Sequence, residues 1–135
     1  MHTFVLRKID QVKGKINFYK LEIDGICEFD QFCDELQRGG EGKVLYYLFA
    51  LMDSIANLRH PPAKKKVREL KGRKKSDHVK DFEIKKDVNG VSKRVYYFKD
   101  ENGNVIVFGS SKSDQEEDIA RLRRIKKEYF NSKIS

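Results

Sequence analysis

Lysine, arginine and tyrosine are the side chains from which this sequence could build a reaction centre. The chain contains no His-Glu-x-x-His, no Gly-x-Ser-x-Gly and no dinucleotide-binding glycine pattern. Its histidines, His2, His60 and His78, stand alone in terminal or loop segments and are expected at the surface. Catalysis would therefore depend on cations and tyrosine hydroxyls, with glutamate as a further option.

These side chains suffice for the cleavage of RNA by its own 2′-hydroxyl. That reaction needs the 2′-oxygen in line with the scissile phosphate, a group that stabilises the transition-state charge, and partners that exchange protons with the two oxygens. Arginine can hold the phosphate through two hydrogen bonds, and a lysine among other cations can exchange protons. No metal or cofactor is expected, because the nucleophile belongs to the substrate.

The overall charge also favours an anionic partner. The chain has 135 residues, of which 37% are charged, a net charge of +8 and a pI near 9.4. Nucleic acid, a membrane surface or an acidic protein would suit this charge, although basic surfaces also occur without such a partner. Residues 61–78 form a basic loop in which Glu69 is the one acidic residue before Asp77. The cations of this loop are candidates for binding RNA phosphates: Lys64, Lys65, Lys66, Arg68, Lys71, Arg73, Lys74 and Lys75.

The N-terminal half is predicted to contain a hairpin and two helices. Residues 4–9 and 15–23 are rich in β-branched and aromatic types and flank a turn. Residues 27–37 and 43–58 carry the apolar spacing of helices; in the second, an open stripe is expected at Tyr46, Ala50, Asp53 and Asn57. Gly-Glu-Gly-Lys between the helices lacks the spacing of a phosphate-binding loop and is interpreted as their connection.

The C-terminal half is predicted to contain three strands and a helix. The strands are expected at 79–86, 93–99 and 104–109, and Asn102-Gly103 indicates that the last two form an antiparallel hairpin. Ser113 and Glu116 could form a capping box at the start of the final helix.

Neither Cys27 nor Cys33 has histidines at metal-ligand spacing, so we expect no zinc, and Cys33 is expected as a buried thiol. The chain has neither a signal peptide nor a membrane-spanning run in its sequence, so a cytoplasmic location is expected.

Several segments resemble the RelE/HigB family of bacterial toxin-antitoxin ribonucleases. Residues 81–85 (DFEIK) are similar to the family's Tyr-Glu-Leu-Arg strand, and residues 93–98 (KRVYYF) to its Tyr-Arg-hydrophobic-hydrophobic-Tyr strand. Residues 105–112 are similar to its apolar strand ending at lysine, and residues 118–129 to its closing helix. The resemblance covers residues 43–130, and the hairpin of residues 1–25 lies outside it.

The resemblance implies a single α+β domain over residues 1–135. Its small antiparallel sheet would be packed by two helices from the N-terminal half and by a C-terminal helix. It also implies a toxin that cleaves messenger RNA on the ribosome and thereby inhibits translation, together with a cognate antitoxin protein that blocks it. The alternatives are a non-catalytic RNA-binding module and a protein-directed toxin of the ParE type on the same scaffold.

The resemblance also implies roles for particular residues. Arg94 would hold the phosphate, Lys85 and Lys112 would assist proton transfer, and Tyr129 would contact a base or the RNA backbone, with Arg121 and Arg124 nearby on the last helix. The structural alternatives are a cross-strand ion pair between Arg94 and Glu83 and an aromatic position at the edge of the core for Tyr129. The chain departs from the family pattern because Lys85 replaces an arginine and Lys112 stands where two lysines are usual, so phosphate binding should be looser.

Overall fold

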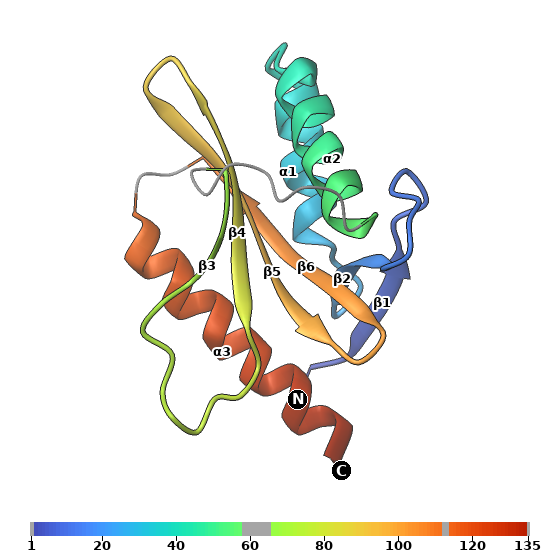
Figure 1. Ribbon diagram of the computed structural model, residues 1–135, viewed down its shortest axis with the longest axis vertical. Helices are drawn as coiled ribbons and strands as arrows, with labels where there is room; N and C mark the ends of the chain where they lie inside the picture. The colour runs from blue at the N-terminus through green and yellow to red at the C-terminus, as the bar shows by residue number, and fades with distance from the viewer. Residues whose placement is uncertain (1, 58–65, 112–113, 135) are drawn as a thin grey trace.

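One mixed sheet lies between two helices on one face and a third helix on the other. The structure is a computed structural model that describes residues 2–57, 66–111 and 114–134. Within these residues the elements follow in the order β1-β2-α1-α2-β3-β4-β5-β6-α3 (Figure 1). Six strands form the sheet, in the spatial order β1-β2-β6-β5-β4-β3. The predicted α+β class is confirmed.

The N-terminal hairpin is part of this sheet. Strands β1 (Phe4–Lys8) and β2 (Phe18–Ile23) pair antiparallel, as predicted. Strand β2 also pairs with β6 (Gly103–Ser110), and this pairing is parallel. The expectation of an antiparallel sheet is therefore wrong at one position, because the hairpin joins the edge of β6 and makes the sheet mixed.

Gly103 allows this parallel pairing to form. Its φ angle is 144°, and a Cβ atom added there would lie 2.3 Å from the carbonyl oxygen of Asn17. The next residue, Asn104, donates its backbone N–H to that same oxygen at 2.9 Å. The predicted antiparallel pairing of β5 (Val91–Asp100) with β6 is confirmed. Besides following the turn, Gly103 gives β2 the space to approach.

Helices α1 (Glu28–Arg38) and α2 (Gly42–Ala56) cover one face of the sheet. Residues 39–41 connect them, while Gly42 and Lys43 of the predicted Gly-Glu-Gly-Lys connection already belong to α2. Leu48 and Met52 of α2 are fully buried. Asn57 differs from the expected open stripe, because it is half-buried and its side-chain amide donates to the carbonyl oxygens of Lys13 and Asp53. Cys33 is only partly buried against this core.

The basic segment contributes a short strand to the sheet. Strand β3 (Val67–Glu69) pairs antiparallel with β4 (Asp81–Val88), which in turn pairs antiparallel with β5. Asn89 and Gly90 connect β4 to β5 with φ angles of 49° and 81°, a pair of left-handed residues that suits a tight hairpin. The interpretation of residues 61–78 as an unstructured loop is therefore wrong for β3, while residues 61–65 lie outside the described residues.

Helix α3 (Gln115–Ile134) covers the opposite face of the sheet. Asp114 caps its start, since its Oδ1 accepts the backbone N–H of Glu117 at 3.1 Å. The predicted cap, Ser113, lies outside the described residues. The buried side chains of α3 include Leu122, Ile125 and Tyr129. Among the described helices, none is long and apolar enough to cross a membrane.

Ion pairs attach the middle of α3 to the sheet. The Asp81 carboxylate is fully buried and contacts Arg123 at 3.0 and 3.1 Å, and Lys126 Nζ at 2.9 Å. Lys126 also contacts Asp77 Oδ2 at 2.6 Å and the carbonyl oxygen of Val79 at 2.7 Å. Because each buried charge has charged and polar partners, the segment that precedes β4 is tied to α3 without an unpaired ion.

Candidate functional site

The predicted residues Lys85 and Arg94 lie side by side on the face of the sheet that α3 covers. Successive side chains of a strand point to opposite faces, so Glu83 and Lys85 of β4 share that face with Tyr96 and Phe98 of β5. Lys85 is the direct cross-strand partner of Arg94, and Arg94 pairs on its other side with Ser110, the last residue of β6. The sheet therefore brings two of the four predicted catalytic residues together.

A buried glutamate stands at the centre of this group. Glu83 is only 2% exposed, and its carboxylate lies 3.5 Å from Arg94 Nε and 3.4 Å from Arg68 Nη2. The side-chain amide of Gln115, in the first turn of α3, donates to Glu83 Oε2 at 2.5 Å. We call Arg68, Glu83, Arg94 and Gln115 the Glu83 cluster. It joins β3, β4, β5 and α3, and it contains the structural ion pair that was the alternative interpretation of Arg94.

Hydrogen-bonding capacity is left over around this cluster. Among the described residues, Arg94 Nε, Tyr96 Oη and Asp118 Oδ2 are buried and have no hydrogen-bond partner. Burial, together with the nearby charges of Asp118 and Glu83, raises the pKa of Tyr96. An interaction with the Asp118 side chain also contributes to this rise, so Tyr96 and Asp118 are close neighbours although Tyr96 Oη and Asp118 Oδ2 do not meet hydrogen-bond geometry. They lie beneath the first turns of α3, next to the Glu83 cluster.

The predicted proton-transfer residues are in different situations. Lys85 is partly exposed, with 27% of its side chain accessible, and its Nζ lies 3.8 Å from Asp87 Oδ2. This long contact with an exposed carboxylate leaves the ammonium group accessible. Lys112 follows Ser110 by two residues in the sequence and lies outside the described residues.

Tyr129 is not brought to this site. Its side chain is 3% exposed, packs against Phe4, Phe98 and Phe130, and donates its hydroxyl to Asp100 Oδ2 at 2.7 Å. Burial and the bond to Asp100 raise the pKa of Tyr129 to about 12. Asp100 lies six residues beyond Arg94 on β5, which corresponds to roughly 20 Å along the strand. Tyr129 is therefore a structural aromatic, as in the alternative interpretation, and it is buried in the core rather than at its edge.

The described cations of the basic segment separate into four groups. Arg68 belongs to the Glu83 cluster, whereas Lys66 lies over the ring of Tyr47 on the other face of the sheet. Arg73 is held by the carbonyl oxygen of Asp77 and by Glu69 Oε2 at 2.9 and 3.4 Å. Side chains exposed to solvent, and so free to meet a partner, are those of Lys71, Lys74 and Lys75. Lys64 and Lys65 lie outside the described residues.

Arg121 and Arg124 line a separate hollow between α3, the start of α1 and the end of β2. The hollow has a volume of about 410 Å³ and is also lined by Ile26 and Glu128. The Arg121 guanidinium pairs with Glu28 and lies 4.8 Å from the ring centre of Phe108, and its pKa is raised by the Glu28 hydrogen bond. Arg121 therefore serves to hold α3 to α1, while Arg124 is exposed beside the hollow.

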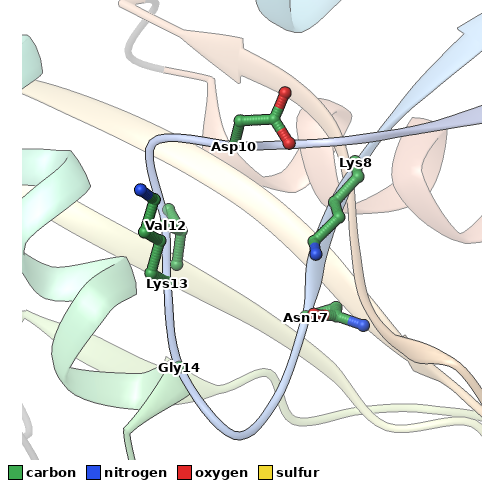
Figure 2. Close-up of a pocket in the computed structure, with 6 residues that line it drawn as sticks. All are labelled: Lys8, Asp10, Val12, Lys13, Gly14 and Asn17. Carbon is green, nitrogen blue, oxygen red and sulfur yellow. The ribbon is translucent and has the colours of Figure 1, made fainter.

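A second hollow of about 410 Å³ lies in the loop between β1 and β2 and is distant from Arg94 in the sheet order. Figure 2 shows its lining, in which the amino groups of Lys8 and Lys13 stand apart on two sides of the loop. The loop packs against the end of α2: a Cβ atom on Gly14 would lie 2.7 Å from the Ala56 carbonyl. This hollow follows from how the loop is anchored and does not gather a set of reactive groups.

Sequence reasoning missed Gln115, Tyr96 and Asp118 as neighbours of Arg94. A signal for them exists in the strands, because Asp81, Glu83 and Lys85 alternate with apolar residues on β4, and Arg94 and Tyr96 do so on β5. A polar stripe of this kind beneath a helix indicates a buried network.

The described residues contain no group of three or more histidine, cysteine or acidic side chains placed to hold a metal ion. Comparisons of the chain with family models, with curated proteins and with solved structures find no match.

Proposed function

We propose that this protein is the toxin of a toxin-antitoxin pair and that it cleaves messenger RNA on the ribosome, as RelE/HigB toxins do. The observation that carries the proposal is the direct pairing of Lys85 with Arg94 beside the Glu83 carboxylate. The sequence resemblance suggests the family, and the proposal assigns phosphate binding to Arg94 and proton transfer to its neighbour Lys85.

The charges of the site favour a phosphate. Arg68 and Arg94 contact the buried carboxylate of Glu83, and Lys85 is the cross-strand neighbour of Arg94. A second buried carboxylate, Asp118, lies near Tyr96. Arg94 uses little of its hydrogen-bonding capacity on Glu83, because the contact to Nε is 3.5 Å long and Nε has no hydrogen-bond partner among the described residues. A guanidinium group with free donors can bind a phosphate through two parallel hydrogen bonds. Arg94 would therefore bind the scissile phosphate and stabilise the charge that develops on it.

The proposed reaction uses the 2′-hydroxyl of the RNA as the nucleophile. The 2′-oxygen forms a bond to phosphorus as the bond from phosphorus to the 5′-oxygen breaks, which leaves a 2′,3′-cyclic phosphate and a free 5′-hydroxyl. The proton of the 2′-hydroxyl leaves to a base, and the 5′-oxygen gains a proton. Lys85 is the described residue beside Arg94 that can exchange a proton at one of these oxygens, and Lys112 is a further candidate. Tyr129 has no part in this proposal.

The proposed partners follow from the same residues. The exposed cations Lys71, Lys74 and Lys75 would contact ribosomal RNA phosphates. A cognate antitoxin would have to cover or deform the surface around Lys85 and Arg94 in order to block cleavage.

The test is cleavage of messenger RNA on programmed ribosomes. Arg94→Ala is expected to reduce the rate by ~100-fold or more, since this is the usual cost of removing one charge-stabilising donor. The matched control is Arg7→Ala, because Arg7 is also a strand arginine paired with a glutamate, Glu22, but lies at the other edge of the sheet. Tyr129→Phe is a second control and should cleave at the wild-type rate.

The outcomes separate the alternatives. Equal rates for the wild type and a folded Arg94→Ala variant would remove Arg94 from the reaction. An absence of cleavage by the wild type at every codon, with RNA binding retained, would instead support the non-catalytic RNA-binding module. Thermal melts of each variant show whether a lost activity reflects a lost fold.

A further inference from the structure

We infer that a second RNA-binding surface lies on the α2 side of the sheet, formed by Lys43, Tyr46, Tyr47, Lys66 and Lys86. We call these residues the α2 patch. Its partner is single-stranded RNA, with phosphates near the lysines and a base on the ring of Tyr46. The inference goes beyond the proposed cleavage site, and it rests on the proposed function only in taking RNA as the partner.

Two lysines share one tyrosine ring in this patch. Lys86 Nζ lies 4.4 Å from the centre of the Tyr47 ring, and Lys66 Nζ lies 4.8 Å from it. Each contact is favourable, because the face of an aromatic ring attracts a cation. The two ammonium groups nevertheless repel each other, and this repulsion would be relieved by an anion that bridges them.

A third lysine adds to the same charge. Lys43 lies one helical turn before both Tyr46 and Tyr47 on α2, at spacings of three and four residues, and it is exposed. Lys93, a neighbouring lysine of the sheet, is paired with Glu41 at 3.4 Å. In the described part of the chain, the three lysines of the α2 patch have no such ion pair.

The exposure of Tyr46 favours RNA over an acidic peptide as the partner. It is 79% exposed, the highest value among the large exposed hydrophobic residues of the described chain. An exposed aromatic ring beside unpaired cations is the arrangement with which proteins bind single-stranded nucleic acids, by stacking bases and neutralising phosphates. An acidic peptide would use the lysines but would gain little from the ring. The combination therefore favours RNA.

The α2 patch is separate from the proposed cleavage site. Lys86 and Lys85 are adjacent on β4, so their side chains point to opposite faces of the sheet. Lys86 reaches Tyr47 of α2, whereas Lys85 lies beside Arg94 beneath the start of α3. Figure 1 shows α2 and α3 on opposite sides of the sheet. RNA bound at the patch would anchor the protein without occupying the cleavage site.

The test measures binding rather than cleavage, so that the two proposals can fail separately. The probe is a short, labelled single-stranded 2′-O-methyl RNA, which has no free 2′-hydroxyl and cannot be cleaved by the proposed reaction. Fluorescence anisotropy of the full chain gives its affinity at several salt concentrations. The double variant Lys66→Ala/Lys86→Ala should lower the slope of log affinity against log salt by about 1.4, or ~0.7 for each lost phosphate contact. Tyr46→Ala should weaken binding roughly tenfold.

The matched control is Lys13→Ala/Lys15→Ala, which removes two exposed lysines from the loop between β1 and β2. A patch variant whose affinity and salt slope equal those of the control would overturn the inference. So would tight binding of a poly-glutamate peptide that depends on Lys66 and Lys86 but not on Tyr46, because the partner would then be an acidic protein. If the patch variants lose RNA binding while the wild type cleaves no messenger RNA, the patch stands and the ribonuclease proposal fails.

Discussion

At the scale of single residues, the contact between Arg94 and Glu83 bears both on the stability of the fold and on the proposed cleavage of RNA. Glu83 is buried between Arg68, Arg94 and Gln115, and the Arg94 side chain is 14% exposed. Removing one partner of a buried ion pair leaves the other charge uncompensated and is strongly destabilising. The same carboxylate limits the positive charge that a substrate phosphate would meet. The pair therefore has both a structural and a proposed functional role.

Glu83→Gln tests the structural role. We expect it to lower the free energy of unfolding by about 2–3 kcal/mol, which is less than for a fully buried pair because half of the Arg68 side chain is exposed. Urea unfolding measures this loss. Glu69→Gln is the matched control, since Glu69 is a largely exposed neighbour paired with Arg73 and should cost under ~1 kcal/mol. Equal losses from the two substitutions would show that the Glu83 cluster does not stabilise the fold.

The sequence predicts strands at residues 79–86 and 93–99, and the family resemblance assigns Lys85 and Arg94 to one site. It does not separate the functional from the structural interpretation of Arg94, since a cross-strand glutamate serves both. For Tyr129, sequence reasoning favours a functional role although the structure gives the residue a structural one. Its type and its place near basic residues fit an RNA contact, but its partners Phe4 and Asp100 come from distant parts of the chain. No local pattern reveals such contacts.

At the scale of elements, α3 is attached to the sheet by acids on the strands and cations on the helix. Asp81 binds Arg123 and Lys126, and Asp100 binds Lys133 at 2.8 Å as well as Tyr129. Burial alone would raise the pKa of Asp100, but the hydrogen bonds from Lys133 and Tyr129 outweigh it and lower the pKa. The pKa of Asp77 is lowered in the same way, because the Lys126 and Val79 hydrogen bonds outweigh burial.

This attachment should weaken in acid. A carboxyl group with a lowered pKa in the folded state contributes stability that is present above its unfolded pKa of ~3.9 and is lost as the pH falls below that value. The urea concentration at which half of the protein is unfolded should therefore decrease as the pH is lowered from roughly 6 to roughly 3. In Asp77→Asn/Asp100→Asn it should be lower at the higher pH and should change less with pH.

Asp34→Asn provides the control for this pH dependence. Asp34 pairs with Arg38 on the exposed side of α1, and more than half of its side chain is accessible. Its substitution should leave the pH dependence as in the wild type. A pH dependence that is the same in all three proteins would contradict the role assigned to Asp77 and Asp100.

The elements themselves are largely predictable from sequence, whereas some of their pairings are not. The helix periodicity of α1 and α2 and the strand composition of β4, β5 and β6 are local signals. The parallel pairing of β2 with β6 joins residues 86 positions apart, as in Phe18 and Asn104, and depends on the missing side chain of Gly103. Strand β3 is hidden in the basic segment, because Val67 is the one apolar residue of its three. The Asn89-Gly90 dipeptide is a local signal for the hairpin between β4 and β5, and the strand prediction from sequence does not use it.

At the scale of the whole molecule, the cations behind the net charge of +8 differ in whether nearby acids neutralise them. Many cations of α3 are neutralised by acids of the sheet and of α1, as the pairs of Arg121, Arg123, Lys126 and Lys133 show. Cations of the neighbouring strands β4 and β5 and of α2 lie on both faces of the sheet, with Lys85 and Arg94 on one side and the α2 patch on the other. This distribution fits a protein that contacts RNA from both faces of one sheet edge.

The measurement that tests the central proposal most directly is cleavage of a ribosome-bound messenger RNA that differs in one oxygen atom. The two substrates carry either a ribose or a 2′-deoxyribose at the nucleotide before the cleaved bond. If the RNA supplies its own nucleophile at the Arg94 site, the ribose substrate should be cleaved by the wild type to a 2′,3′-cyclic phosphate end. The deoxyribose substrate should remain intact, and Arg94→Ala should cleave neither at a comparable rate. Cleavage of both substrates by the wild type, or of neither, would contradict the proposal.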